Sequence, residues 1–409
     1  MTDSTTPADD ARAGSRPERL RLTPAERRAS ISLALLFAVR MLGLFLLTPI
    51  FAVAAPTLAG GNDPLRVGLA LGAYGLTQAI MQIPLGMASD RWGRRPIIVG
   101  GLAAFVAGGV ICALATDVDW VIVGRTIQGL GAISAAITAW LADATRPEVR
   151  TRAMAMVGAS IGLSFALSLV LSPVLVGEFG LSGLFWVISL MGFACLLIAT
   201  FVVPSVPRAP LPGTQARMAD VLRHADLLRL NFGVFCLHFI LMALFIVVPG
   251  MLSTLGGFDS ATLWKVYLPV ILASFVLMVP AVFVTETRHA YKTTLDISVL
   301  VLALMLGLMA FSVDSFNGVV ATLIGFFVAF NILEALQPSL VSRVAPPEYK
   351  GLALGLYNTA QNLGIFLGGA IGGLLASAGR SAVVLLASAG LALLWYVAAR
   401  GFQAPVRGR

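Results

Sequence analysis

Four ionisable side chains stand inside long apolar stretches of the sequence, where a charge is costly and is therefore expected to serve a function. They are Arg40, Arg125, His238 and Glu334. A carboxyl group in such a place can take up and release a proton, so we predict that Glu334 is the main proton-coupling site. The alternative is that Glu334 forms a structural ion pair with an arginine.

The three basic groups admit more than one role in this chemistry. The imidazole of His238 titrates near neutral pH, so it can assist a proton relay or contact a substrate; a lone histidine in a helix also serves as a packed hydrogen-bonding group. Arg40 and Arg125 can pair with Glu334, modulate its protonation, or hold anionic groups of a substrate. Structural pairing accounts equally well for Arg40.

Neutral polar side chains recur at helical spacing in two further apolar stretches, and one more lies a turn before Glu334. Such side chains hydrogen-bond a substrate or hold helices together, and the spacing alone does not separate the two roles. The substrate-binding candidates are Tyr74, Gln78, Gln82, Asn331, Asn358, Gln361 and Asn362.

A short polar loop carries the densest cluster of charge between two apolar stretches. It reads Gly86-Met87-Ala88-Ser89-Asp90-Arg91-Trp92-Gly93-Arg94-Arg95-Pro96. On composition alone, this is a tight turn with the basic residues that are typical of cytoplasmic loops. The spacing of its charged residues and glycines is more specific than a turn requires.

The elements that must position these residues are membrane helices. Of the 409 residues, 58% are apolar and 12% are charged, whereas an ordinary soluble domain is about a quarter charged, which excludes a soluble enzyme. We predict an all-α membrane protein with twelve spans, each long enough to cross ~30 Å of hydrocarbon. The spans are 30–53, 67–87, 96–115, 120–141, 153–176, 183–203, 230–252, 264–284, 295–311, 316–341, 351–376 and 381–399.

The distribution of positive charge predicts the orientation of these spans. Of the 28 Lys and Arg residues, 23 fall in the two tails and the loops that follow even-numbered spans, and only Arg66, Lys265 and Arg380 fall in the opposite loops. Cytoplasmic loops carry the excess of basic residues, so both termini are expected in the cytoplasm. The net charge of +8 is thus a topology signal and requires no nucleic acid.

The chain is predicted to consist of two related six-span halves. A proline-rich and then polar stretch interrupts the spans at the midpoint, and Pro147-Glu148-Val149-Arg150 aligns with Pro347-Glu348-Tyr349-Lys350 at an offset of 200 residues. Parallel repeats around a central site are a recurring transporter plan. The predicted parts are a polar cytoplasmic tail (1–29), two six-helix bundles (30–203 and 230–399), a cytoplasmic linker (204–229) and a second tail (400–409).

Two motifs in these positions resemble those of the major facilitator superfamily. The loop at 86–96 resembles its motif A, G-x-x-x-D-R-x-G-R-R, and Gly124-Arg125-Thr126-Ile127-Gln128-Gly129-Leu130-Gly131 resembles its motif B. Further segments, among them Tyr74-Gly75-Leu76-Thr77-Gln78 and Phe330-Asn331-Ile332-Leu333-Glu334, are similar to the YajR-type proton-driven efflux subgroup over residues 30–400. Span five departs from the antiporter pattern, because Ser172-Pro173 stands where Gly-Pro is expected.

The resemblance implies a gating role for Gly86, Asp90, Arg91, Gly93, Arg94, Arg95 and Asp143. Asp90 would face the start of span eleven near Gly351, and Arg94 would bridge Asp90 to Asp143. A carboxylate is favourable at a helix N-terminus, so this latch would hold the outward-open state. The YajR-type subgroup has a further cytoplasmic domain after span twelve; this chain continues for ten residues beyond its last predicted span, so we expect that domain's role to be absent or supplied by another protein.

These observations together predict a secondary transporter of the bacterial inner membrane that works as a monomer on a small-molecule substrate and H+. Proton-coupled export of drugs follows from the resemblance; a proton-coupled symporter or a uniporter of a metabolite, such as a sugar or an organic anion, is the alternative. ATP-driven transport is disfavoured because no G-x-x-x-x-G-K-[ST] motif is present. We expect no cofactor, metal or nucleic acid, and no enzymatic activity.

Overall fold

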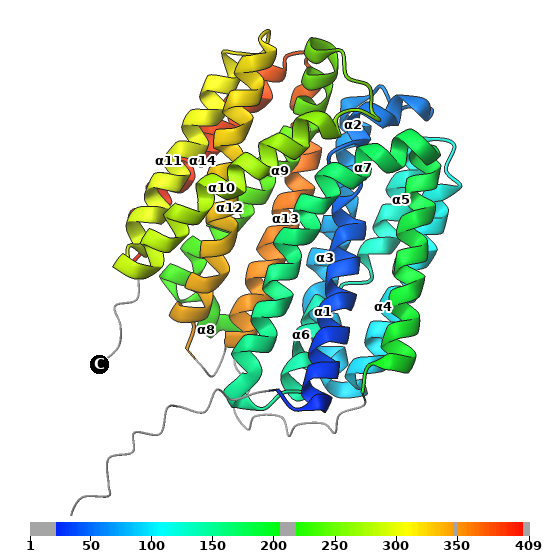
Figure 1. The fold of residues 1–409 in the computed structure, drawn as a ribbon, viewed down its shortest axis with the longest axis vertical. Coiled ribbons are helices and arrows are strands. Elements are labelled where there is room, and N and C mark those ends of the chain that lie inside the picture. Colours follow the sequence, from blue (N-terminus) through cyan, green and yellow to red (C-terminus); the bar gives the residue numbers. More distant parts are fainter. Residues whose placement is uncertain (1–21, 205–217, 347–349, 404–409) are drawn as a thin grey trace, which may run out of the picture.

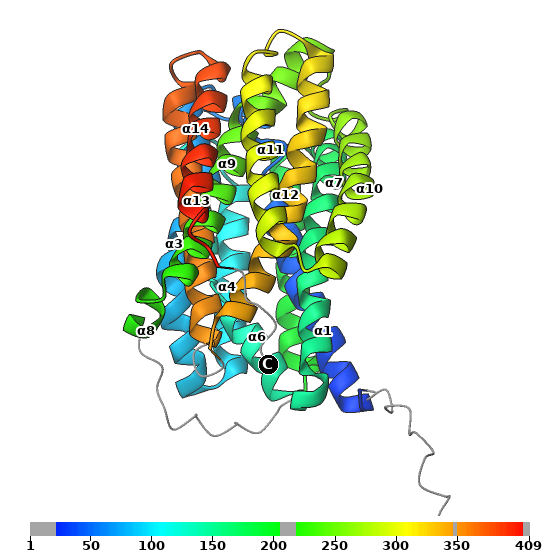
Figure 2. The same ribbon diagram turned by 90° about the vertical axis from the view of Figure 1, so that its left-hand side faces the viewer.

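The computed structural model describes residues 22–204, 218–346 and 350–403. Most of the two predicted tails and half of the predicted linker therefore lie outside the described residues. The described chain forms a bundle of long helices in two groups, with α1–α7 on the right of Figure 1 and α9–α14 on the left. We use "tail end" for the end of the bundle where α1 begins, and "far end" for the end where α3 begins; Figure 2 shows the same bundle from the side.

The first group contains α1 (Pro24–Phe45), α2 (Phe51–Ala54), α3 (Pro64–Trp92), α4 (Arg94–Ala113), α5 (Val118–Gly129), α6 (Ser134–Asp143) and α7 (Pro147–Leu197), which continues as the π-helical turn η2 (Ile198–Val202). The second contains α9 (Ala225–Gly256), α10 (Trp264–Arg288), α11 (Tyr291–Ala310), α12 (Phe316–Val344), α13 (Lys350–Ala376) and α14 (Ser381–Ala399). The short helix α8 (Met218–Leu222) and the first turn of α9 lie within the range that the sequence indicates as the linker.

Helical segments cover all twelve predicted spans, but the helix boundaries do not coincide with the predicted span boundaries. Ten segments of the described chain are long and apolar enough to cross a membrane. Spans five and six both lie within α7, whose helical backbone is broken by a turn at Gly180, where φ is 67°. The 29-residue α3 is the span that hydropathy alone does not select. Spans one and four are each interrupted, span one between α1 and α2 and span four between α5 and α6.

Local side chains explain where several helices begin. Thr23 forms a reciprocal capping box with Glu26 at the start of α1. Asp63 accepts a hydrogen bond from the Leu65 amide and is followed by proline, a combination that favours the first turn of α3. Gly93, with φ of 102°, forms the sharp turn between α3 and α4, a backbone conformation that a side chain would strain.

Serine hydroxyls fix α7 against α1 within the first group. Ser164 donates to the carbonyl of Ala38 at 2.9 Å, and Ser172 donates to that of Leu46. Small hydroxyl side chains allow two helices to approach closely while their polar groups stay paired. Ser172, the residue at the departure from the antiporter motif, is thus a packing contact between spans one and five.

The two groups meet most closely where α3 crosses α13 toward the far end. A Cβ atom on Gly68 would lie 2.1 Å from the carbonyl oxygen of Gly369, and one on Gly373 would lie 2.4 Å from that of Pro64. Glycine is required because the two backbones are in contact. Toward the tail end, a Cβ on Gly355 of α13 would meet no atom within 4 Å, so α13 has no such backbone contact there.

Candidate functional site

Two buried arginines flank a single tyrosine in the first group. The guanidinium of Arg40 donates to the Tyr74 hydroxyl and to the Ser134 hydroxyl, each at 2.7 Å. The guanidinium of Arg125 lies 4.8 Å from the centre of the Tyr74 ring and donates to the Gln128 side chain at 3.0 Å. Both arginines are 1% exposed. Among the described residues, neither has a carboxylate within 4.0 Å, so two cations are buried without an anionic partner.

The other polar candidates of the first group lie on the same helix as Tyr74. Gln78 and Gln82 of α3 are buried, and hydrogen-bond partners are missing for the Gln78 amide nitrogen and for both polar atoms of the Gln82 amide among the described residues. A buried amide without a partner is unfavourable by roughly 1–3 kcal/mol. These groups are therefore available to a ligand or to water.

Glu334 forms a second cluster with His238 and Gln361, which come from α12, α9 and α13. Oε2 of Glu334 lies 3.6 Å from Nε2 of His238, and the Gln361 amide nitrogen lies 2.7 Å from the same Nε2. His238 is buried, whereas the Glu334 side chain is 25% exposed. Three helices of the second group thus converge on one carboxylate.

The contacts of His238 determine its tautomer. Nδ1 lies 3.1 Å from the carbonyl oxygen of Val234, which can only accept, so Nδ1 carries the hydrogen. Nε2 then faces the amide nitrogen of Gln361 at 2.7 Å. A proton added at Nε2 would face a donor in Gln361 and an acceptor in Glu334. Protonation therefore favours a hydrogen bond from His238 to Glu334 and requires the Gln361 amide to turn.

The four intramembrane ionisable residues therefore form two separate groups. The basic side chain beside Glu334 is His238, and no Lys or Arg nitrogen of the described residues lies within 4.0 Å of that carboxylate. Arg40 and Arg125 instead gather around Tyr74.

Two of the remaining candidates, Asn331 and Asn362, donate hydrogen bonds within the helix bundle. Asn331 donates to the Ser274 hydroxyl of α10 at 3.0 Å, and Asn362 donates to the carbonyl of Asn358, one turn earlier in α13, at 2.8 Å. The partly exposed Asn358 has no side-chain hydrogen bond among the described residues. These contacts place Asn331 and Asn362 in the packing between or along helices, while Asn358 remains open to a ligand.

Aromatic rings close the bundle on the far side of Glu334. Phe165 of α7 contacts Phe45 of α1 and three rings of the second group, with centroid distances of 5.3–6.5 Å. Two of those rings, Phe327 and Phe330, precede Glu334 on α12 by about two turns and one turn, respectively. The rings and the α3–α13 contact together separate the Glu334 cluster from the far end.

The charged loop after α3 forms a compact network in the first group. Arg94 contacts the carboxylate of Asp90, and its Nε lies 3.0 Å from Asp143 Oδ2. Arg95 donates to the carbonyl of Val203 at 2.6 Å and covers the Trp140 ring. The exposed Arg91 has no partner among the described residues.

The predicted contact between Asp90 and span eleven stays a prediction, because residues 347–349, just before α13, lie outside the described residues. Among the described residues, the Asp90 carboxylate pairs with Arg94, and a Cβ on Gly351 would meet nothing within 4 Å. A Cβ on Gly86 would meet only Ala135, at 3.6 Å, within its own group.

Sequence reasoning missed the partners that hold the candidates in place. Ser134, Gln128 and Ser274 each bond a predicted residue, and Gln337 and Tyr357 are buried with unpartnered polar atoms among the described residues. Gln128 and Gln337 could have been recognised from the sequence, because they are polar residues inside apolar spans. A serine in such a span gives no comparable indication.

Nothing in the described part of the chain groups three or more His, Cys, Asp or Glu side chains as a metal site requires. Cys112, Cys195 and Cys236 are buried and free.

Comparison with known proteins places these features in one family. The profile described as "Major Facilitator Superfamily" matches residues 33–369. The "Inner membrane transport protein YajR" of Escherichia coli (strain K12) is 41% identical over 389 residues, which cover 94% of this chain and 85% of YajR. The "Multidrug resistance protein MdtH" of Aeromonas hydrophila is 26% identical over 355 residues, 85% of this chain and 86% of MdtH. The crystal structure of a D-xylose–proton symporter shares the fold, with a TM-score of 0.76 at 15% identity over 92% of this chain and 98% of the symporter.

Proposed function

Because the chain belongs to the major facilitator superfamily and is thus a multi-pass inner membrane transporter, we propose that it is a proton-coupled antiporter that exports small molecules by alternating access. The observation that carries the proposal is the Glu334–His238 pair, an acid and a titratable base 3.6 Å apart among apolar helices. Intramembrane ionisable residues mark proton relays and substrate paths. The names of the relatives YajR and MdtH support transport and drug export.

The tail end faces the cytoplasm in this proposal, which the excess of basic residues in the tails and in the loops after even-numbered spans supports. The described conformation is then inward-facing, since the aromatic rings and the α3–α13 contact close the far end. In the outward-open state, Asp90 binds the N-terminal end of α13, and Arg94 and Asp143 hold its carboxylate in position. The present conformation, in which the Asp90 carboxylate pairs with Arg94, is the released state of this latch.

The proton cycle follows from the contacts of His238. Glu334 takes a proton from the outer side in the outward-open state, which releases the substrate. After the change to the inward-facing state, the proton leaves toward the cytoplasm from the Glu334 carboxyl group, whose side chain is 25% exposed. A proton on Nε2 of His238 would turn this atom from the Gln361 amide nitrogen toward the Glu334 carboxylate, because protonated Nε2 donates and does not accept.

The buried arginines indicate the charge of the substrate. Arg40 and Arg125 bring two positive charges without a carboxylate within 4.0 Å among the described residues. A buried charge without a partner is unfavourable by several kcal/mol, and an anionic group would remove that penalty. We therefore expect neutral or anionic compounds to be exported in preference to dications.

The test is proton movement in energised everted vesicles that contain wild-type protein, Glu334→Gln or the control Glu178→Gln. Glu178 is an exposed acid two residues before the Gly180 turn of α7, so its replacement leaves the proposed site intact. We expect at least one compound of a broad panel to collapse the pH gradient with the wild type and the control, and not with Glu334→Gln.

The direction of compound movement distinguishes the antiporter from its alternatives. An antiporter accumulates the compound inside everted vesicles with an acidic interior, whereas a symporter expels it. Movement of compounds without loss of the gradient, alike in the wild type and Glu334→Gln, would refute proton coupling and leave a uniporter.

A further inference from the structure

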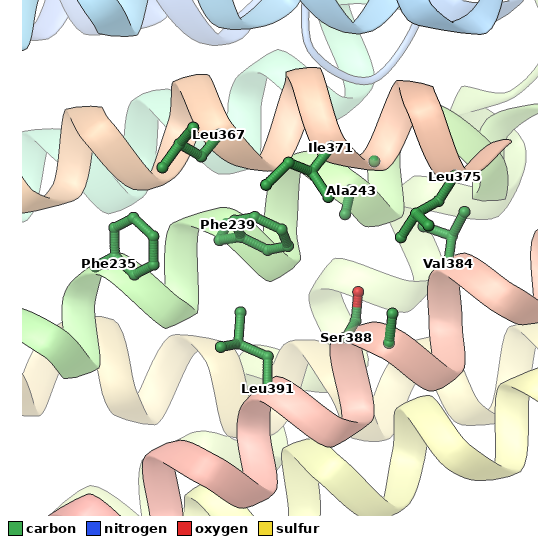
Figure 3. Close-up of a pocket in the computed structure, with 11 residues that line it drawn as sticks. Phe235, Phe239, Ala243, Leu367, Ile371, Leu375, Val384, Ser388 and Leu391 are labelled. Carbon is green, nitrogen blue, oxygen red and sulfur yellow. The ribbon is translucent and has the colours of Figure 1, made fainter. Parts of the chain in front are cut away.

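A groove on the outer surface of the second group is not used by the proposed transport cycle. It lies between α9, α13 and α14, encloses about 290 Å³, and is lined by apolar side chains with one hydroxyl (Figure 3). Its lining on α13 runs from Leu367 to Leu375, the last turn before the far end. The groove therefore occupies the far-end half of the membrane.

Small residues create the hollow. Ala243 of α9, Gly372 of α13, and Ala387 and Ser388 of α14 lie among larger phenylalanine and leucine side chains of the same helices. Gly372 brings α13 against Ala243, where its Cβ would lie 2.9 Å from the Ala243 Cα. Helix α14 packs mainly on α9 and α11 and much less on α13. The space between α13 and α14 is thus left unfilled.

The groove opens away from the first group, because α13 meets α3 through other residues, Gly369 and Gly373. Ile371, on its rim, is 40% exposed, and Ala387 is also exposed. An apolar recess at this depth faces hydrocarbon, since the helices around it span the membrane. At ~30 Å³ per small group, the volume accommodates about ten methylene-sized units, a segment of one acyl chain.

A positive charge stands at the far-end mouth of this groove. Arg380 is the N-cap residue of α14, four residues before Val384, which lines the groove. Arg380 is exposed, and no carboxylate of the described residues lies within 4.0 Å of it. It is also one of three basic residues that the sequence places in the loops at this end. An apolar recess below an unpaired cation matches the chemistry of an anionic amphiphile.

We propose that this groove binds an anionic phospholipid of the outer leaflet, with one acyl chain between α13 and α14 and its phosphate at Arg380. Ser388, 1% exposed, is the single polar side chain of the lining, and Figure 3 shows its oxygen directed toward α9 and α13. Because α13 also forms the contact with α3, the lipid borders the helix on which far-end closure depends. This proposal holds whichever ion drives transport.

The experiment measures the lipids that remain bound after purification from vesicles of equal phosphatidylglycerol and phosphatidylethanolamine. Ala387→Phe fills the groove from its exposed rim, and Leu393→Phe adds the same ring at a 50% exposed position of α14 outside it. Arg380→Gln removes the charge. Equal thermal unfolding midpoints establish that each variant is folded.

We expect the wild type and Leu393→Phe to retain phosphatidylglycerol preferentially, and Ala387→Phe to retain less of both lipids. Arg380→Gln is expected to lower the phosphatidylglycerol preference about fivefold, the effect of one basic side chain at an anionic surface. Equal retention by Ala387→Phe and Leu393→Phe would overturn the acyl-chain site. An unchanged lipid preference in Arg380→Gln would overturn the role of the headgroup.

Discussion

Replacing Gly68 by alanine should shift the protein away from the conformation described here. The new Cβ would lie 2.1 Å from the carbonyl oxygen of Gly369, which is 1.3 Å short of the 3.4 Å at which ordinary contact begins. The neighbouring atom belongs to the backbone and cannot rotate aside. Overpacking of this kind costs about 1–3 kcal/mol. The penalty applies only while the far ends are in contact, so the population ratio should move about 5–150-fold toward the outward-open state.

Distances between spin labels at the far end measure this shift. Thr57 and Ser377 are exposed, lie at the far end, and belong to the first and second group. The three native cysteines are buried, so labels attach selectively to cysteines introduced at these two positions. In Gly68→Ala, the distance distribution should move from one short population to a dominant longer one.

Gly390→Ala and Gly307→Ala are the matched controls. A Cβ at either position meets no atom within 4 Å, so these variants gain the same helix propensity without the clash. Both should keep the wild-type distribution. A wild-type distribution in Gly68→Ala as well would show that contact between the α3 and α13 backbones does not govern far-end closure.

Three further predictions concern other contacts. Glu26→Gln removes the ion pair to Arg146, at 2.8 Å, while a glutamine can keep the α1 capping box, so the free energy of unfolding should fall by about 1 kcal/mol; detergent-induced unfolding followed by circular dichroism checks this, and an unchanged midpoint contradicts it. Phe165→Ala removes the ring that joins the two groups above Glu334, so vesicles should lose their pH gradient faster without any compound, and a wild-type leak rate argues against an aromatic barrier. Arg125→Gln should weaken the apparent affinity for anionic compounds about tenfold while neutral compounds change little, because a hydrogen bond to a charged group is lost; equal effects on both classes would assign Arg125 a structural role.

The sequence allowed much of the fold to be predicted because hydropathy is a local property. Each apolar run of about 20 residues requires a helix in the membrane, whatever its neighbours are. The turn at Gly180, where the helical backbone of α7 is broken, falls within the predicted gap between spans five and six. The interruption of span four was harder to predict, because it lies inside an apolar run where the sequence gives little sign of it.

The candidate site was likewise predictable only in part from the sequence. Sequence alone determined which ionisable groups lie within the membrane, because a charge in an apolar run is visible residue by residue. Only the tertiary structure decided which groups meet: Arg40 finds Ser134, 94 positions away, and His238 finds Gln361, 123 positions away. Burial forces each polar group to find a partner. The packing of whole helices, through glycines that let backbones touch, determines which partner is in reach.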